Sequence, residues 1–472
     1  MVDSRSAAER ILLWTGHLFF GVLIVSCIVF YQERLLAFDT AYYMFHILAY
    51  DEFFIKHDRY VSYLTQWVPL WGMEQGWSLE WIMRSFSASF YLWFYLVFML
   101  ISHGFRSITG GTFLVATLSL GMRYKFFAAI SEITFAMVLA ALLLAWLAHR
   151  PKHLRLGVID FGVVAVCLTG IFGAHVVVLY PIMTFLVFER LYNGRWKEWT
   201  SWIMPALIVV VFLIKFLAVQ GDEYESDKMA VLFQPDIIRD VLLNPGDYFI
   251  YRALLDYFTL EYVPVMLLFL AGVGWLWRTR KIGSAVFISG AFLGWLFINL
   301  VVYSYLESSL YIMLDGYLAI FGMIWATPFY FIWRGNKTTT LAWVAVALIA
   351  LSTGMMLSKK SFYKQRLEYI EQTLALHPEH EKLLVPASAF NWETMWYPYE
   401  VAHESLMLTA LEGREQCRTI YVNIDAPADA EFLASDQFLQ FHGSVPLKVF
   451  SYSRFFSLPE APYTVVDTVA WK

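Results

Sequence analysis

Two carboxylates stand at the ends of apolar segments, where they could act as acid–base groups. Asp39 follows the first long apolar run of the chain, and Glu132 opens another within the stretch RYKFFAAISEITFAM. An ionised side chain at the centre of a membrane helix costs on the order of 2.5–3.5 kcal/mol, so charges retained at a membrane face are generally paired or used. We predict that bundle packing brings Asp39 and Glu132 into one cavity, where a carboxylate accepts a proton as general base.

Basic residues accompany these carboxylates and could bind a phosphate. The candidates on the same predicted face are Arg59, Arg84, Arg123, Lys125, His175 and Lys228. Cations stabilise the negative charge that develops on a departing phosphate. Because a phosphate leaves readily, no dedicated general acid is needed. The combination predicts group transfer from a lipid phosphate donor.

Each of these residues also has a structural explanation. Asp39 could simply cap the helix that follows it, since Asp is a favoured N-cap residue, and Glu132 could be an interfacial cap. The arginines and lysines could extend to lipid headgroups. His175 could be a satisfied polar residue in a re-entrant corner, and the acidic residues at 222–227 could form a solvated loop.

The composition indicates a membrane protein. Hydrophobic residues make up 59% of the 472 residues and charged residues 15%, whereas soluble domains carry about 25% charged residues. The net charge of −5 is scattered along the chain, so nothing indicates binding to nucleic acid. The three cysteines have no metal-ligand spacing.

Apolar runs long enough to cross a bilayer predict about eleven membrane helices. They lie near 11–31, 86–103, 110–122, 132–148, 157–174, 175–190, 200–219, 261–277, 283–304, 310–333 and 338–357. Lysine and arginine are concentrated in the short turns on the N-terminal side, which predicts that this side is cytoplasmic. An odd number of spans then places the C-terminus on the opposite face.

Two parts of the chain lie outside these spans. The segment 37–85 is too polar to cross a bilayer and rich in aromatic residues, which predicts one or two amphipathic helices along the membrane surface. After residue 357, short β-like runs at Thr419–Ile424 and Leu447–Ser451 alternate with helical stretches at Tyr363–Leu376 and Tyr399–Leu411. We therefore predict a polytopic α-helical membrane domain over 1–357 and a small α/β extracytoplasmic domain over 358–472.

The segment after the first span resembles the first external loop of the GT-C superfamily of glycosyltransferases, integral-membrane enzymes that use polyprenyl-phosphate-linked sugars. The residues that carry the resemblance are Asp39, Tyr42, Tyr43, Phe53, Phe54, Arg59, Gln66, Pro69, Gly76, Trp77, Ser78, Arg84 and Ser85, followed by Ser131 and Glu132. The resemblance covers residues 1–190. Beyond them, only the layout of many spans followed by an extracytoplasmic domain is similar.

The resemblance implies an inverting glycosyltransferase with Asp39 and Glu132 as catalytic residues and the six cations at the donor phosphate. The donor would be a polyprenyl-phosphate-linked sugar, and the acceptor an extracytoplasmic glycan, lipid or protein. The location would be a bacterial inner membrane, in a cell-envelope pathway. Many relatives carry paired acidic residues in this loop, whereas Asp39 is flanked by Phe38 and Thr40. The nearby pair Asp51 and Glu52 leaves the identity of the base and a divalent cation open.

Further residues are candidates for acceptor binding or for support of the catalytic groups. They are Tyr42, Tyr43, Asp51, Gln66, Trp392 and Glu400. The last two belong to a dense aromatic and acidic stretch of the tail, which could instead be the contact with the membrane domain.

Two other functions stay open. A transporter or lipid flippase of an envelope polysaccharide pathway is the main alternative, but such folds generally have internal repeats and charges near the bilayer midplane. No repeat is visible here, and apart from Lys215 the charges lie at the ends of the apolar runs. An assembly scaffold would need neither a cavity nor an acid–base pair.

Overall fold

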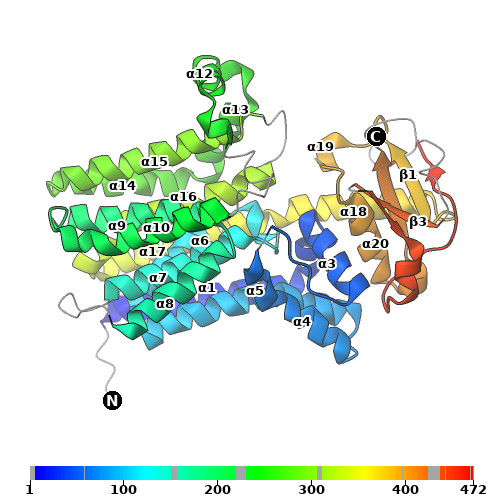
Figure 1. Ribbon diagram of the computed structural model, residues 1–472, viewed down its shortest axis with the longest axis horizontal. Helices are drawn as coiled ribbons and strands as arrows, with labels where there is room; N and C mark the ends of the chain where they lie inside the picture. The colour runs from blue at the N-terminus through cyan, green and yellow to red at the C-terminus, as the bar shows by residue number, and fades with distance from the viewer. Residues whose placement is uncertain are drawn as a thin grey trace.

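The computed structural model describes residues 6–57, 59–149, 157–218, 230–305, 311–395, 397–423, 436–441, 443–467 and 469–470. It is 74% helical. A bundle of helices carries a smaller, strand-containing C-terminal region at the end away from the N-terminus (Figure 1).

Five helices of the described chain are long and apolar enough to cross a membrane. They are α1 (Ala7–Val29), α5 (Leu79–Met99, with a π-helical turn Leu100–Gly104), α15 (Ile282–Val302), α16 (Tyr311–Gly335) and α17 (Thr339–Ser358), which continues into α18 (Lys360–Leu376). A sixth span results if the segments Phe249–Glu261 and Val263–Arg278, bent by 83°, count as one. These features are consistent with a helical membrane protein.

Each apolar run predicted from the sequence coincides with a helix. The remaining ones are α6 (Ile108–Gly121), α7 (Glu132–His149), α8 (Val158–Phe172), α9 (Leu179–Tyr192), α10 (Ile203–Ala218) and α14 (Val263–Arg278). They are shorter than the five above, so the number of eleven spans stays a prediction. Short elements connect them: η3 (Tyr124–Phe126), η4 (Val176–Val178), η5 (Trp199–Trp202), η6 (Val231–Phe233), α12 (Pro235–Leu243), η7 (Pro245–Asp247), α13 (Phe249–Asp256) and η8 (Tyr257–Glu261).

The centre of the bundle is the contact between α6 and α16. A Cβ added at Gly121 would lie 2.2 Å from the carbonyl oxygen of Ala319, and one added at Gly322 would lie 2.4 Å from that of Thr117. Small residues let two membrane helices approach to backbone contact in this way. Trp325, on the same helix, is fully buried. The polar groups discussed below lie at the end of this packed core.

The predicted surface segment forms α2 (Tyr31–Leu35), α3 (Asp39–Tyr50), η1 (Tyr60–Ser62) and α4 (Tyr63–Glu74). Helix α4 exposes Tyr63, Leu64, Trp67 and Trp71 at helical spacing, as expected of an interfacial helix. Helix α3 differs, because most of its residues are buried against the C-terminal region. The sequence pattern did not indicate this cover.

The C-terminal region contains a parallel sheet in the order β2 (Thr419–Asn423), β1 (Lys382–Pro386), β5 (Thr464–Val465). It also contains the hairpin β3–β4 (Gln437–Gln440, Gly443–Pro446), the helices α19 (Trp392–Met395) and α20 (Val401–Ala410), and the turns η9 (Arg414–Gln416) and η10 (Leu447–Ser451).

One strand prediction in this region is confirmed and one is wrong. Thr419–Asn423 is a strand, whereas Leu447–Ser451 is a 3-10 helix. The strand before it ends at Pro446, which lacks the N–H needed to continue the ladder. Leu447 and Phe450 are both buried, and a spacing of three residues places two side chains on one side of a 3-10 turn.

Candidate active site

Asp39 begins α3 where the bundle meets the C-terminal region, and its side chain is exposed. Phe38, not Asp39, occupies the N-cap position, so the interpretation of Asp39 as the N-cap is wrong. As the first helical residue, Asp39 lies at the positive end of the helix dipole, where a negative charge is stabilising. The carboxylate therefore faces solvent at a fixed point of the fold.

Glu132 opens α7 and forms an ion pair with Arg59, with 3.1 Å between Oε2 and Nη1. Both side chains are largely buried, at 11% and 17% exposed. Tyr43 of α3 lies within range of these charges. Burial raises the pKa of its phenol, the charges of Glu132 and Asp39 raise it further, and Arg59 lowers it. Three of the predicted site residues thus act electrostatically on one buried phenol.

Gln66 of α4 fastens the loop that follows α3. Its Oε1 accepts the N–H of Phe54 at 2.8 Å, and its Nε2 donates to the carbonyl of Phe54 at 2.7 Å. The ring of Phe54 packs against those of Tyr42 and Tyr43. In the same loop, the Lys56 ammonium lies 4.2 Å above the Tyr42 ring. Gln66 therefore supports the site by holding the loop that carries Lys56.

Glu400 reaches this face from the C-terminal region. It is buried, its Oε2 lies 2.7 Å from Nδ1 of His403, and Nε2 of His403 lies 2.9 Å from Oε1 of Gln440. Burial, together with the charges of Asp39 and Glu404, raises the pKa of Glu400 to about 9. Burial also lowers the pKa of His403 to about 3. A neutral Glu400 can donate to Nδ1, while the Nε2–H of a neutral His403 donates to Gln440.

Arg84 and Arg123 are committed to contacts within the protein. Arg84 pairs with Glu80, donates to the carbonyl of Ile28 at 2.8 Å and lies over the Tyr31 ring. Arg123 is fully buried and donates to the carbonyls of Ser119, Leu120 and Met122 at the end of α6, and to that of Glu261. These contacts occupy the hydrogen-bond donors of the Arg123 guanidinium.

The remaining predicted phosphate ligands are Lys125, His175 and Lys228. The backbone N–H of Lys125 donates to Asp315 at 2.7 Å, and its side chain lies against Gly316. His175 is buried with its ring edge-on to Tyr317, at 5.7 Å between centroids. Lys228 lies outside the described residues.

Asp51 and Trp392 lie at element boundaries. Asp51 ends α3 in a left-handed conformation (φ 55°) with an exposed side chain. Trp392 opens α19, donates from Nε1 to the carbonyl of Ala387 at 3.1 Å and packs on Phe390.

Four residues of this face were missed by the sequence analysis: His46, Lys56, Arg366 and His403. Rings of His46 and His403 both contact Tyr42. His403 follows Glu400 by three residues, a spacing that places both on one side of a helix and could have indicated the pair. Arg366 and Lys56 have no comparable signal in the sequence.

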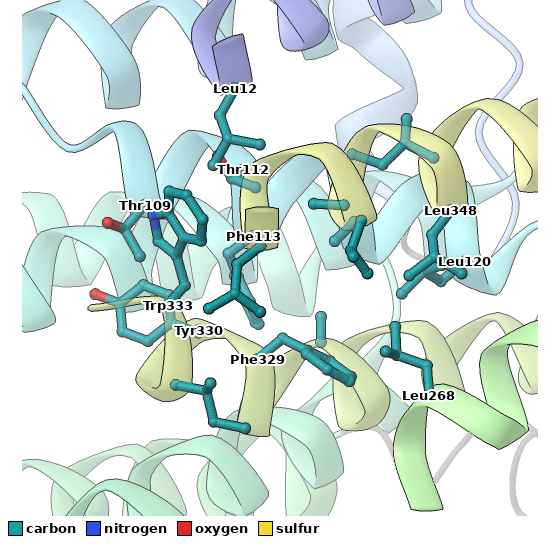
Figure 2. Close-up of a pocket in the computed structure, with 17 residues that line it drawn as sticks. Leu12, Thr109, Thr112, Phe113, Leu120, Leu268, Phe329, Tyr330, Trp333 and Leu348 are labelled. Atoms are coloured by element: carbon teal, nitrogen blue, oxygen red, sulfur yellow. The ribbon is translucent and has the colours of Figure 1, made fainter. Parts of the chain in front are cut away.

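Two apolar cavities lie between the helices. The larger, about 310 Å³, is bounded by α9, α10, α15, η6 and α16, and Tyr317, which contacts His175, is part of its wall. The smaller, about 110 Å³, lies between α1, α6, α14, α16 and α17. Figure 2 shows apolar side chains such as Leu120, Leu268, Phe329 and Leu348 around it. Neither cavity is polar enough to be a reaction centre on its own.

Within the described residues, no group of three or more histidine, cysteine or acidic side chains is arranged to hold a metal ion. No protein-family model, no curated protein and no solved structure matches the chain. The resemblance to the GT-C superfamily therefore stays a prediction from the sequence.

Proposed function

We propose that this protein is an integral-membrane glycosyltransferase of the GT-C type. It moves a sugar from a polyprenyl-phosphate-linked donor to an extracytoplasmic glycan, lipid or protein, with inversion at the anomeric carbon. About eleven spans would carry the site, with the N-terminus in the cytoplasm of a bacterial cell and the C-terminal region on the outer face of the inner membrane. The observation that carries the proposal is that the exposed carboxylate of Asp39 and the buried ion pair of Arg59 and Glu132 all act electrostatically on the phenol of Tyr43.

In this reaction Asp39 would accept the proton of the attacking hydroxyl. A general base has to reach its proton directly or through one water, and the exposed end of α3 allows that approach. Glu132 is buried and paired, so its part would be to hold Arg59 near the reaction centre.

The cations would bind the donor phosphate. Lys56 and Arg59 would be the phosphate-binding cations, since both belong to the segment after α3 that Gln66 holds. A guanidinium and an ammonium would together neutralise the charge that collects on the leaving phosphate. Arg366, also on this face, is fully buried and held in an ion pair. Arg123 is a less suitable phosphate ligand, because its guanidinium already donates to backbone carbonyls.

The lipid part of the donor needs an apolar path. The cavity of about 310 Å³ beside Tyr317 is lined almost entirely by apolar side chains, and it lies between membrane-type helices. A hydrocarbon chain would be stabilised there by burial of its surface.

The test is transfer of a radiolabelled sugar from polyprenyl-phosphate donors in membranes that contain the protein. We expect Asp39→Asn to lower turnover by about 10²-fold or more, the usual scale of a general base. The variant to compare is Asp51→Asn at the other end of α3, the alternative candidate for the base, because Asn tolerates the left-handed conformation of this position. It should retain turnover near the wild-type value.

The outcomes separate the alternatives. If Asp51→Asn loses turnover and Asp39→Asn does not, the base is Asp51. If Glu132→Gln weakens donor binding as Arg59→Met does, Glu132 acts through Arg59. If no donor and acceptor from a broad panel supports transfer by the folded wild type, the glycosyltransferase proposal fails. The flippase alternative would then be tested by measuring movement of the lipid donor between the two leaflets of vesicles that contain the protein.

A further inference from the structure

We propose that Glu404 of α20 is a positioning residue that holds Phe38 in an unusual backbone conformation and thereby aims the carboxylate of Asp39. The inference rests on the proposed function, because the orientation of Asp39 matters only if Asp39 is the general base. It assigns the C-terminal region a direct part in arranging the base.

The starting point is the backbone of Phe38. Its φ is 55° and its ψ is −146°, close to a region that essentially only glycine occupies. A bulky residue persists there only when its surroundings hold it, and such residues cluster at functional sites. Phe38 directly precedes Asp39, so its two dihedral angles set the direction in which α3 begins.

The surroundings of Phe38 come from the C-terminal side of the chain. Its N–H donates to Oε1 of Glu404 at 2.6 Å. Its ring lies under the guanidinium of Arg366, 4.2 Å from Cζ to centroid, and stacks on Phe362 with an interplanar angle of 6°. The edge of Tyr363 closes another side at 6.0 Å. Backbone and ring are thus held by different groups.

Glu404 is itself held firmly. Its Oε2 accepts from Nε of Arg366 at 2.8 Å, and both side chains are fully buried. The remaining donors of Arg366 bind the carbonyls of Met395 and of Tyr397, the latter at 2.8 Å. The oxygen that binds Phe38 therefore belongs to a network joining α18, the end of α19 and α20.

The same helix places a second acidic group near Asp39. Glu400 is the N-cap residue of α20, about one turn before Glu404, and the charge of Asp39 acts on it. If the network loosened, Phe38 would relax to an ordinary conformation and Asp39 would turn relative to Glu400 and Arg59. A glycine at position 38 would adopt this conformation without strain and would keep the N–H that donates to Glu404. It would lose only the contacts of the aromatic ring.

The experiment uses the full-length protein and compares Glu404→Gln, Phe38→Gly and the double variant. Glu404→Gln keeps an oxygen that can accept from Phe38 but loses the charge that pairs with Arg366, so the side chain is no longer held in place. We expect it to lower kcat by about tenfold with little change in the KM for donor, because a small misplacement of a reacting group is costly. Phe38→Gly should keep most of kcat, and adding it to Glu404→Gln should recover part of the loss. Glu368→Gln, at an exposed pair with Lys364 on α18, is the control and should match wild type.

A second measurement reports on orientation without turnover. In an Asp39→Cys background the new thiol is exposed, while Cys27, Cys167 and Cys417 are buried. Its labelling rate by a thiol reagent should change with Glu404→Gln and return toward the starting value when Phe38→Gly is added.

The two proposals fail in different ways. If Asp39→Asn retains turnover, the base assignment falls, and the labelling rates alone decide whether Glu404 positions residue 39. If folded Glu404→Gln leaves both kcat and labelling unchanged, the positioning role is overturned. A loss of activity that Phe38→Gly does not relieve, together with an unchanged labelling rate, would mean that Glu404 only stabilises the fold.

Discussion

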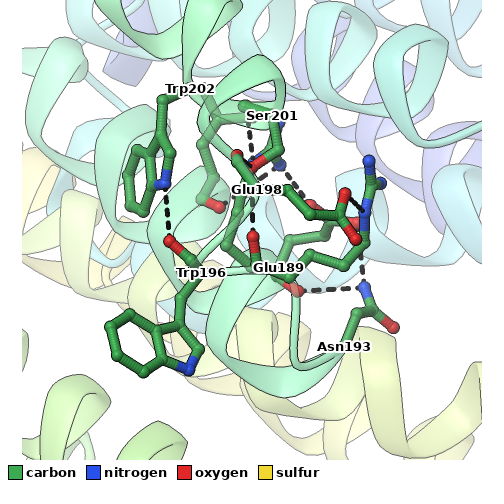
Figure 3. A network of polar contacts seen from close by, with 9 residues as sticks. Glu189, Asn193, Trp196, Glu198, Ser201 and Trp202 are labelled. Carbon is green, nitrogen blue, oxygen red and sulfur yellow. Dashed lines mark hydrogen bonds and ion pairs between the residues drawn. The ribbon is translucent and has the colours of Figure 1, made fainter.

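Two charged networks lie at different parts of the molecule, and they differ in how their partners are distributed along the chain. The first is the α9–α10 turn, residues 189–202, shown in Figure 3. The second is the α3–α20 contact, which consists of Phe38, Arg366, Glu400, His403 and Glu404. Both join arginine to glutamate, and both contain aromatic rings.

In the α9–α10 turn every partner is local. Arg190 donates to the carbonyl of Ser201 at 2.9 Å, Arg195 pairs with Glu198 at 2.7 Å, and the Trp202 indole donates to the carbonyl of Trp196 at 3.0 Å. These partners lie at most eleven residues apart. The bonds close a turn and satisfy backbone groups at two helix ends.

In the α3–α20 contact the partners are distant, apart from Glu400 and His403, which are three residues apart. Arg366 and Glu404 are 38 residues apart, and Phe38 and Glu404 are 366 apart. Closing such long loops costs chain entropy without shaping any local turn. The contact also adjoins an exposed acid, because Phe38 directly precedes Asp39 and the charge of Asp39 acts on Glu400. Charge density is therefore the same kind of signal in both networks, and what distinguishes the α3–α20 contact is that distant parts of the chain meet next to an accessible acid.

The largest expected contrast is in stability. Arg366→Met would leave Glu404 buried without its counter-charge, and breaking a buried pair in this way costs about 3–5 kcal/mol. The matched change in the turn is Arg195→Met, whose pair with Glu198 is partly exposed and worth about 0.2–1 kcal/mol. Thermal unfolding in detergent should show a much larger shift for Arg366→Met. Equal shifts would remove the distinction between the two networks.

A smaller effect should appear in the pH dependence of stability. The pKa of Glu400 is raised from 4.5 to about 9, chiefly by burial. The folded protein therefore keeps this proton while the unfolded chain releases it, and the resulting stabilisation is complete below pH 4.5 and lost as the pH rises toward 9. Glu400→Gln has no proton to release.

The measurement is the difference in unfolding temperature between Glu400→Gln and wild type at several pH values. We expect the variant to gain relative to wild type as the pH rises from 5 to 9. Parallel curves would show that Glu400 is ionised in the folded protein.

The sequence predicted the membrane-type helices well because a long apolar run indicates a helix through its own residues and needs no information about distant partners. It also grouped Asp39, Tyr43 and Arg59, which lie in or just after one short helix, α3. Arg123 shows what the sequence could not reveal: an arginine after an apolar helix can face lipid headgroups or turn back onto the last carbonyls, and only packing decides.

The sequence allowed the tail stretch around Glu400 to be a contact with the membrane domain, but the partners that meet in the contact between α3 and α20 were beyond reach for a related reason. Glu404 and Arg366 lie in helices of the tail, and no periodicity links them to Phe38. A phenylalanine also gives no local signal that its φ is positive, because that conformation depends on groups supplied by the far end of the chain.

The smallest expected effect is on the free energy of unfolding, for a substitution in the α9–α10 turn. Ser201 donates from Oγ to the carbonyl of Glu198 at 2.7 Å, with the carbonyl of Arg195 at 3.2 Å, whereas the side-chain bonds of Arg190 and Arg195 do not use that hydroxyl. Ser201→Ala should lower the free energy of unfolding by about 0.5–1.5 kcal/mol, the worth of one hydrogen bond, and leave kcat unchanged. Transfer assays and unfolding on the same preparation would check both. A clear loss of kcat at unchanged stability would mean that a locally closed network can also serve the reaction, and the contrast between local and distant partners would no longer separate structure from function.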